Sequence, residues 1–128
     1  MNIEDIREYC LSLPMSTEDM PFEPDGVAFR GLGKIFAYID LNNDDYFCLE
    51  CNAQYALELR EKHHNEIAGA FHWNKKYWNQ VSYRGTLSDS FIKHLIRHRY
   101  REVVGKLPKR IIGEHREVLT VEDKKCFN

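Results

Sequence analysis

Two polar turns divide residues 27–51 into three short apolar stretches, and this spacing constrains the fold more than any other feature. The turns are Gly31-Leu32-Gly33-Lys34 and Asn42-Asn43-Asp44-Asp45. Between them, residues 35–41 alternate as expected for a strand with one buried face. Turns this short can join only antiparallel neighbours, because a parallel crossover needs a dozen residues or more. The sequence therefore predicts an antiparallel β-meander.

Helical spacing of apolar residues marks three further segments. Each follows a polar residue that can cap the first turn of a helix. The predicted helices cover residues 3 to about 13 after Asn2, residues 53–63 after Asn52, and residues 89 to about 106 after Ser88. Pro14 and Pro108 follow the first and the last of them, and proline ends a helix.

The remaining segments carry weaker patterns. Residues 14–25 hold three prolines and are predicted to form a loop, and residues 64–76 show no clear element. Residues 78–83 are typical of one more strand, and residues 117–121 of a short strand or a docked arm. The order α-β-β-β-α-β-α predicts an α+β fold, in which helices pack on one face of an antiparallel sheet.

Length and composition agree with one domain. A chain of 128 residues with 43% hydrophobic residues can fill one core, and 30% charged residues with 12% aromatics argue against disorder. No apolar run approaches the roughly 20 residues that cross a bilayer. The acidic N-terminus lacks the features of a signal peptide. We therefore expect a cytoplasmic protein with no membrane partner, whose four cysteines are free thiols.

The small net charge of −2 conceals an uneven distribution along the chain. Residues 1–66 hold 5 Lys/Arg and 14 Asp/Glu, whereas residues 67–128 hold 13 Lys/Arg and 6 Asp/Glu. A uniformly basic nucleic-acid-binding protein has a different composition. The sequence leaves open whether this division along the chain becomes a division in space.

Four stretches of the chain together carry a family pattern. They are Ile6-Arg7-Glu8-Tyr9-Cys10-Leu11-Ser12-Leu13-Pro14 with Thr17-Glu18-Asp19 and Pro21-Phe22, then Val27-Ala28-Phe29-Arg30 with Gly33-Lys34-Ile35-Phe36-Ala37, then Asn74-Lys75-Lys76-Tyr77-Trp78-Asn79, and finally Leu95-Ile96-Arg97-His98 with Val103-Val104 and Lys106-Leu107-Pro108-Lys109. In order and spacing they resemble the MmcQ/YjbR family, whose fold is related to that of frataxin (CyaY-like). The resemblance implies one domain over residues 1–109, with residues 110–128 as an extension that packs on it or trails from it.

The same resemblance implies a DNA-binding protein, because members of the family are described so from a double-wing arrangement of hairpins. Fold by itself does not fix function. The sequence also departs from the family pattern at three positions. Glu23 replaces a frequent glycine, Glu50 replaces a common lysine, and Arg99 replaces a common serine. The last two changes remove positive charge from a predicted strand and add it to a predicted helix.

Basic residues crowd the last predicted helix and its exit. They are Lys93, Arg97, Arg99, Arg101, Lys106, Lys109 and Arg110, against one acid, Glu102. Lys93, Arg97 and Arg101 are four residues apart and share one helix face, opposite the apolar one. Such a stripe can contact successive phosphates. The alternative is a solvated face whose last bases complement the helix dipole.

A second candidate is the entrance of the predicted strand 78–83. Lys75 and Lys76 can hold phosphate, and Tyr77 and Trp78 can stack on a base or a sugar. The alternative for the two aromatic residues is packing in the core or on the sheet. Arg84, at the end of this strand, adds a further base.

Two pairs of residues have spacings known from redox or metal sites. Cys48 and Cys51 form a CxxC, but residues three apart in a strand face opposite sides, and no second CxxC completes a zinc site. His94 and His98 can share one side of a helix, yet Leu95 stands where the zinc protease motif has its glutamate. We predict no metal and no cofactor.

Acidic residues near the first helix support an alternative function. They are Glu4, Asp5, Glu8, Glu18, Asp19, Glu23 and Asp25. Frataxins use an acidic ridge on their first helix and strand, so this face could serve a protein- or metal-interaction module. No nucleotide loop, nucleophile elbow or Ser/His/Asp order appears. We therefore favour a non-enzymatic protein that contacts double-stranded DNA through phosphates, with its oligomeric state left open.

Overall fold

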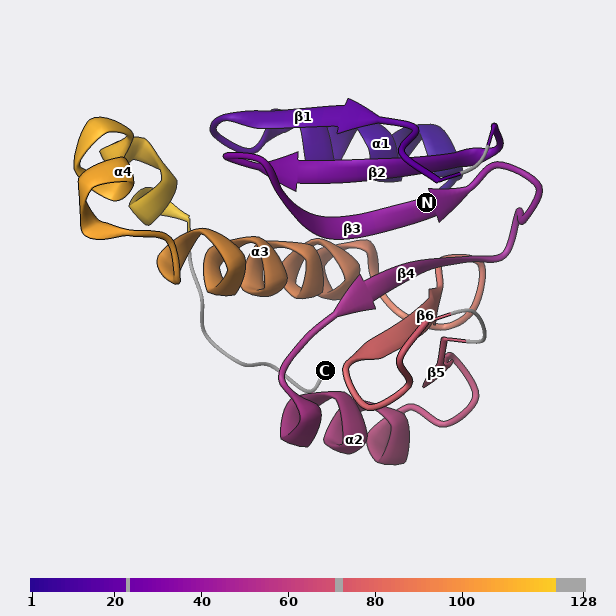
Figure 1. Ribbon diagram of the computed structural model, residues 1–128. Coiled ribbons are helices and arrows are strands. Elements are labelled where there is room, and N and C mark those ends of the chain that lie inside the picture. Colours follow the sequence, from indigo (N-terminus) through magenta and orange to yellow (C-terminus); the bar gives the residue numbers. More distant parts are fainter. Residues whose placement is uncertain (23, 71–72, 122–128) are drawn as a thin grey trace.

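The computed structural model describes residues 1–22, 24–70 and 73–121, and Figure 1 shows how their elements are arranged. Helix α1, Ile3–Ser12, begins as predicted. The Asn2 side chain accepts a hydrogen bond from the Asp5 amide, and the Asp5 carboxylate accepts one from the Asn2 amide. This reciprocal cap fixes the start of the helix.

Six strands form one antiparallel sheet. They are β1 (Ser16–Asp19), β2 (Gly26–Gly31), β3 (Lys34–Asp40), β4 (Tyr46–Glu50), β5 (Ile67–Gly69) and β6 (Trp78–Ser82). Their order across the sheet is β1-β2-β3-β4-β6-β5. The predicted meander is confirmed as β2–β3–β4. Its first turn places Leu32 and Gly33 at positive φ, and glycine adopts that conformation at little cost.

The other two predicted helices are also confirmed. Helix α2, Ala53–Lys62, and helix α3, Asp89–Gly105, begin at side-chain caps from Asn52 and Ser88. Beyond them the chain forms the short helix α4, Lys109–Glu114, and the 3-10 helix η1, Arg116–Thr120. The predicted domain boundary at residue 109 therefore falls at the start of α4.

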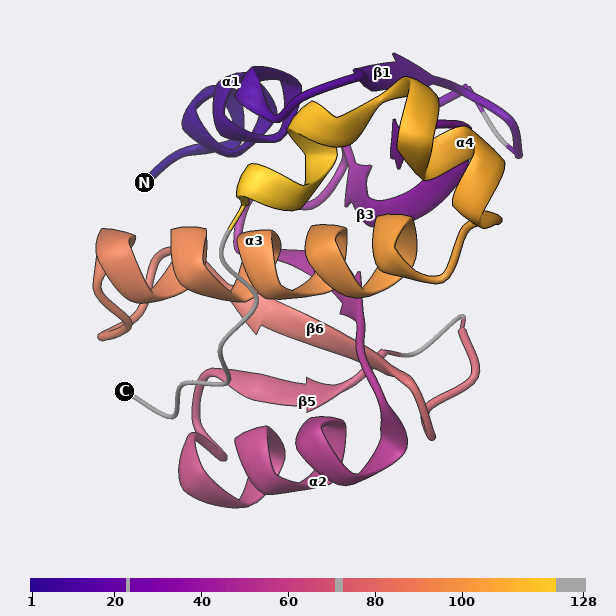
Figure 2. The same ribbon diagram turned by 90° about the vertical axis from the view of Figure 1, so that its left-hand side faces the viewer.

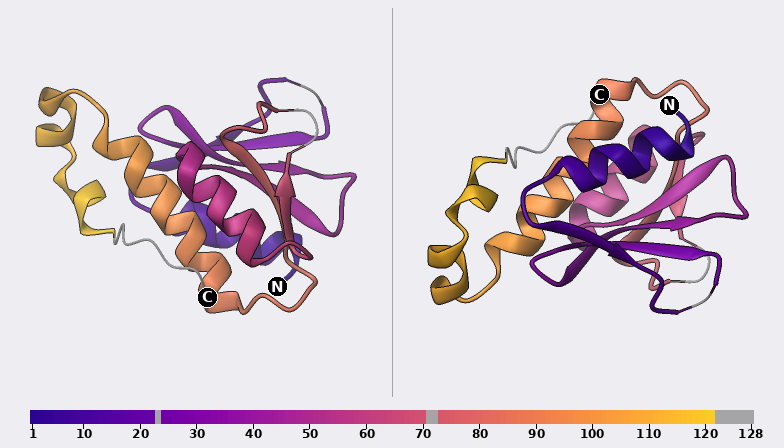
Figure 3. Two further views of the ribbon diagram at one scale, coloured as in Figure 1. Left: turned by 90° about the horizontal axis from the view of Figure 1, so that it is seen from below. Right: turned by 90° about the horizontal axis from the view of Figure 1, so that it is seen from above.

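In the part of the chain that the structure describes, helices cover one face of the sheet and leave the other face without any. Figure 3 shows α1, α2 and α3 on the same side of the strands, and the main core lies between them and the sheet. This arrangement confirms the predicted α+β class. On the other face, the register aligns Ala28, Tyr38 and Cys48 in a row across the strands. A second, smaller cluster of Ala28, Tyr38, Ala70 and Trp78 lies there.

The predicted loop over residues 14–25 is wrong in part, because it contains strand β1. Its sequence, Ser16-Thr17-Glu18-Asp19, has no apolar alternation and lies at the sheet edge. Backbone pairing with β2 and two ion pairs hold it instead: Arg7 binds Glu18, and Arg30 binds Asp19. Hydrophobic spacing in the sequence does not predict a strand of this kind.

Two other segments differ from expectation. Residues 64–76 include the short edge strand β5, which has only three residues. Residues 117–121 do not form a strand but belong mostly to η1, and Val118 is fully buried against the core that includes α3. The alternative of a docked arm is therefore the correct one. Within the described chain, no helix combines the length and the apolar character needed to cross a bilayer.

Candidate nucleic-acid interface

The first two bases of the predicted stripe on α3 contact helix α1. The ammonium of Lys93 lies 5.4 Å from the centre of the Tyr9 ring, and an Arg97 Nη1–H donates to Tyr9 Oη at 2.7 Å. Both side chains are partly buried. These contacts join α1 to α3, so Lys93 and Arg97 have a structural role that their spacing did not indicate.

Arg99 forms an ion pair with Glu50 at the end of β4, and its Nη1 lies 3.9 Å from Glu102. The Arg99 side chain is only 11% exposed and that of Glu50 30% exposed. Glu50 and Arg99 are two of the three positions where this sequence departs from the family pattern. The structure shows that they are partners, so the two departures compensate each other.

His98 is buried one turn before Glu102. Its Nε2 lies 3.4 Å from Glu102 Oε1, and its ring meets the Tyr55 ring edge-on at 4.8 Å between centroids. Asn52 also donates to the Glu102 carboxylate. The nearby His98 imidazole is the main reason why the pKa of Glu102 lies below its ordinary value, and burial opposes it. His98 is thus part of a packed polar network between α2, α3 and β4.

The remaining bases of α3 and α4 gather at one end of the molecule. We define the basic end by its members, which are Lys34, Arg101, Lys106, Lys109, Arg110 and Arg116. Lys34 was not predicted; it joins them because Gly31, which pairs with it, lies against Tyr100 and Val104 of α3. All but Arg101 are exposed, and among the described residues no carboxylate pairs with any of the six.

The second predicted segment lies elsewhere. Lys75, Lys76 and Tyr77 are exposed in the loop before β6, where the Tyr77 carbonyl accepts from the Cys51 amide. The Lys76 ammonium lies 5.5 Å from the centre of the Tyr77 ring. Trp78 is 6% exposed and stacks on Trp73 at 4.2 Å, which agrees with the packing interpretation. Among the described residues, Tyr77 presents an exposed ring beside these lysines.

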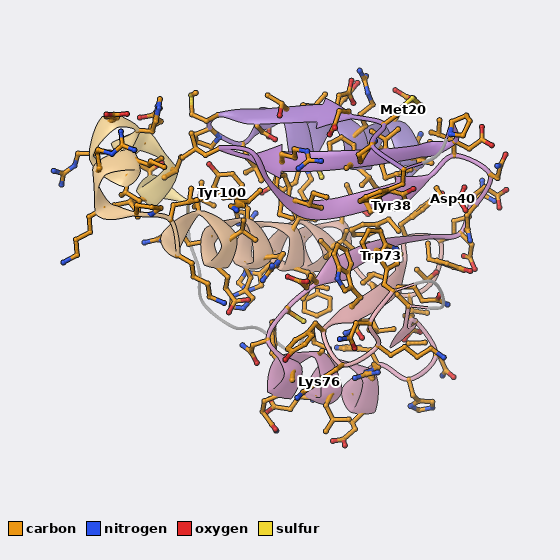
Figure 4. The ribbon with its side chains drawn as sticks, viewed as in Figure 1. Met20, Tyr38, Asp40, Trp73, Lys76 and Tyr100 are labelled. Atoms are coloured by element: carbon orange, nitrogen blue, oxygen red, sulfur yellow. The ribbon has the colours of Figure 1, made fainter. Side chains whose placement is uncertain are left out.

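The predicted contact residues therefore fall in separate places rather than on one surface. In Figure 2, α4 lies on one side of α3, whereas α2 and the loop that leads into β6 lie on the other. Figure 4 shows Lys76 correspondingly far from α4. Arg84 lies beyond β6 and forms an exposed ion pair with Asp44 at 3.4 Å.

The predicted acidic face is neutralised only in part where its residues are described, because two of its acids form ion pairs. Glu18 and Asp19 pair with Arg7 and Arg30, and Asp5 belongs to the helix cap. Beside α1 there is a shallow groove, in which Lys93 and the N-terminal ammonium offset three acids, Asp5, Glu8 and Asp89. Glu23 lies outside the described residues.

The cysteine and histidine patterns do not form a reactive centre in the described chain. Cys48 lies on the helix-free face of the sheet and Cys51 in the main core, as the strand geometry predicts. Burial raises the pKa of Cys48 to about 11 and that of Cys51 to about 12, so both are protonated thiols near neutral pH. Among the described residues, no group of three or more His, Cys, Asp or Glu side chains could hold a metal ion. Cys126 lies outside them.

Comparison with known proteins places this arrangement in a family. The chain is similar to the structure of the Deinococcus radiodurans protein DR2400, a DUF419 domain, with 28% identity, a TM-score of 0.76, and coverage of 96% of this chain and 91% of that one. It also shares the fold of a Pseudomonas syringae protein, with 22% identity, a TM-score of 0.64, and coverage of 80% and 99%. No curated protein matches significantly. The predicted likeness to frataxin stays a prediction. The YjbR family model matches residues 11–102, and the chain therefore belongs to the YjbR family.

Proposed function

We propose that this protein is a non-enzymatic DNA-binding protein that contacts duplex phosphates through its basic end. One observation carries the proposal: the bases of the basic end have no carboxylate partner among the described residues, whereas Arg97 and Arg99 do have partners in the fold. An unpaired surface base can neutralise a phosphate and release its condensed counterion. A base already paired with a carboxylate gains little from doing so.

The surroundings of the basic end support contact with a polyanion. Helix α4 stands at one end of the molecule in Figure 1, and the turns with Asp25, Asp40 and Asp44 lie at the opposite end of the sheet. Glu114 and Glu117 also lie at this end, but its six bases outnumber them, and a duplex that approaches α4 stays away from the acids of these turns. Contacts of this kind fix position but carry little sequence information, so we expect weak base specificity.

The cysteines and His98 support the non-enzymatic part of the proposal. Nucleophilic catalysis by cysteine requires a thiolate, and burial raises the pKa of Cys48 and Cys51 far above neutrality. His98 lies against Tyr55 and Glu102, with only 4% of the residue exposed. Neither group is placed to act on a substrate from solvent.

Fluorescence anisotropy with a labelled duplex, over a series of salt concentrations, tests the proposal. The triple variant Lys106→Glu, Lys109→Glu, Arg110→Glu should lose affinity, and the slope of log Kobs against log salt should fall by about 3, roughly one unit for each phosphate contact. A matched variant, Lys62→Glu, Lys76→Glu, Arg84→Glu, changes net charge equally but leaves the basic end intact. It should keep most of the wild-type slope.

The two variants separate three outcomes. If DNA affinity falls in the first variant but not in the matched variant, the result supports the basic end as the interface. Loss in the matched variant only would move the interface to the loop before β6 and the end of that strand. The absence of any binding by the wild-type protein at about 50 mM salt, where phosphate contacts are strong, would overturn the proposal.

A further inference from the structure

The helix-free face of the sheet carries an aromatic cluster whose outer members are exposed. Phe22 lies 5.7 Å from Trp73 and 6.2 Å from Tyr38, measured between ring centroids. Phe22 is 61% exposed, and the nearby Met20 and Leu41 are 52% and 50% exposed. Figure 4 shows Met20, Tyr38 and Trp73 gathered at the end of the sheet that lies away from α4. Exposed apolar side chains clustered in this way mark interaction surfaces.

Acids surround this apolar surface, and we name the two together the acidic corner. Its members are Met20, Phe22, Leu41, Asp25, Asp40, Asp44 and Asp45. The backbone joins its two loops, because the Leu41 amide donates to the Asp25 carbonyl at 2.7 Å. Asp25 and Asp40 accept hydrogen bonds from Asn42, which is neutral. Among the described residues, Arg84 alone pairs with one of these carboxylates.

The basic end has the complementary properties. Its bases lie beside two further exposed apolar residues, Met15 at 45% and Leu119 at 38%. Met15 reaches this end because its carbonyl accepts from the Leu32 amide in the β2–β3 turn. Apolar side chains next to carboxylates at one end, and next to ammonium and guanidinium groups at the other, make the two ends complementary.

We propose that the acidic corner of one copy of this chain docks on the basic end of a second copy. One chain cannot join its own two ends, because they lie at opposite ends of the sheet in Figure 1. The contact is head-to-tail, so a bound copy still offers one free end of each kind, and growth is open unless a ring closes. Exposed aromatic and basic side chains also attract each other directly.

The expected association is weak and sensitive to salt. Each apolar patch involves only a few side chains, fewer than the roughly 20 to 30 residues per partner of a stable interface. We expect a dissociation constant on the order of 100 µM in low salt. Raising the salt to about 1 M, where the Debye length is about 3 Å, should return the protein to monomer.

Sedimentation velocity with nucleic-acid-free protein, over a concentration series, tests the proposal. Two variants each remove one end: Asp40→Lys with Asp44→Lys, and Lys109→Glu with Arg110→Glu. All four positions are exposed, so both variants should fold, and circular dichroism checks this. Each variant alone should be monomeric, because its altered end repels the intact end of its neighbour. An equimolar mixture should associate again, because each variant supplies the end that the other lacks.

The mixture is the decisive sample. A wild-type protein that stays monomeric at millimolar concentration in low salt overturns the proposal, and so does a mixture that stays monomeric while the wild type associates. Association that persists in each variant alone also overturns it, because a different surface is then responsible. No DNA is present, so these outcomes are independent of the DNA-binding proposal. A further variant, Phe22→Ser, should weaken association at least about tenfold, as loss of an aromatic anchor does.

Discussion

The N-terminal part of α3 and the C-terminal part that continues into α4 carry the same kinds of basic residue, yet the fold uses them differently. Lys93 and Arg97 contact Tyr9 of α1, and Arg99 pairs with Glu50 of β4. Lys109 and Arg110 are exposed and have no carboxylate partner among the described residues. Bases in the first part stabilise tertiary structure, and bases in the second part remain free for a partner.

This difference follows from what lies opposite each part of the helix. The first part is enclosed by α1 on one side and by the end of β4 on the other, so its long side chains reach tyrosine and carboxylate groups. The second part extends past the sheet to α4 and η1, whose own acids, Glu114 and Glu117, form no ion pair with Lys109 or Arg110 in the described chain. Charge at helical spacing therefore predicts a surface stripe, but only the tertiary neighbours decide whether that stripe is available.

The largest expected effect comes from removing the Arg99 charge. Arg99→Met keeps much of the apolar stem but leaves Glu50 and Glu102 without their guanidinium partner, in a site where Arg99 itself is 11% exposed. We expect the free energy of unfolding to fall by about 2 kcal/mol, because an uncompensated half-buried carboxylate is costly. Urea denaturation at pH 7 measures this change.

The partner variant shows whether the cost belongs to the pair. Glu50→Gln should lower the free energy of unfolding less in the Arg99→Met background than in the wild type, because the carboxylate that it removes is already unpaired there. If Arg99→Met is as stable as the wild type, the bases in the first part of α3 do not stabilise the tertiary structure as their contacts indicate.

The second prediction concerns the dependence of stability on pH at Glu102. The folded-state pKa of this carboxyl lies below its ordinary value of 4.5, chiefly because the His98 imidazole lies beside it. The resulting stabilisation is complete above that ordinary value and is lost as the pH falls through the lower, folded-state pKa. Glu102→Gln should therefore reduce stability at pH 7, by about 1 kcal/mol.

Glu102→Gln should also flatten the acid side of the stability curve, since this group no longer titrates. Urea denaturation between pH 7 and the acid transition measures both effects. If the free energy of unfolding of the variant falls with decreasing pH as steeply as that of the wild type, other carboxylates account for the loss of stability in acid.

Much of the fold could be predicted from the sequence, because local chemistry specifies it. The caps at Asn2, Asn52 and Ser88 and the turn at Leu32–Gly33 each depend on a few adjacent residues. Strand β1 could not be predicted in this way. Its residues are polar, and only the pairing with β2 and the ion pairs of Glu18 and Asp19 make it a strand.

The candidate site could be predicted less well, for the same physical reason. The sequence shows seven bases from Lys93 to Arg110. The partners that divide them lie far away along the chain, because Tyr9 is 88 positions from Arg97 and Glu50 is 49 positions from Arg99. Lys34 joins the basic end only because the β2–β3 turn packs beside α3. Glu50 and Arg99 did carry a signal, since both depart from the family pattern with opposite charge.

A smaller effect is expected at the contact between α1 and α3. Tyr9→Phe keeps the ring under Lys93 but removes the oxygen that accepts from Arg97. We expect a loss of about 0.5 to 1 kcal/mol in the free energy of unfolding, the net value of one hydrogen bond. DNA affinity should not change, because neither contact involves the basic end. A loss of affinity without a loss of stability would reassign Arg97 to the interface.

The smallest expected effect on stability is at the basic end itself. Lys109→Met and Arg110→Met remove exposed charges that have no carboxylate partner in the described chain, so each should change the free energy of unfolding by less than about 0.5 kcal/mol. The same substitutions should each lower the salt slope of DNA binding by about 1. Arg99→Met is the matched control, because it should show the reverse: a large loss of stability and an unchanged slope. If Arg110→Met destabilises the protein as much as Arg99→Met does, Arg110 also has a structural role. The bases of α4 would then not differ from those in the first part of α3.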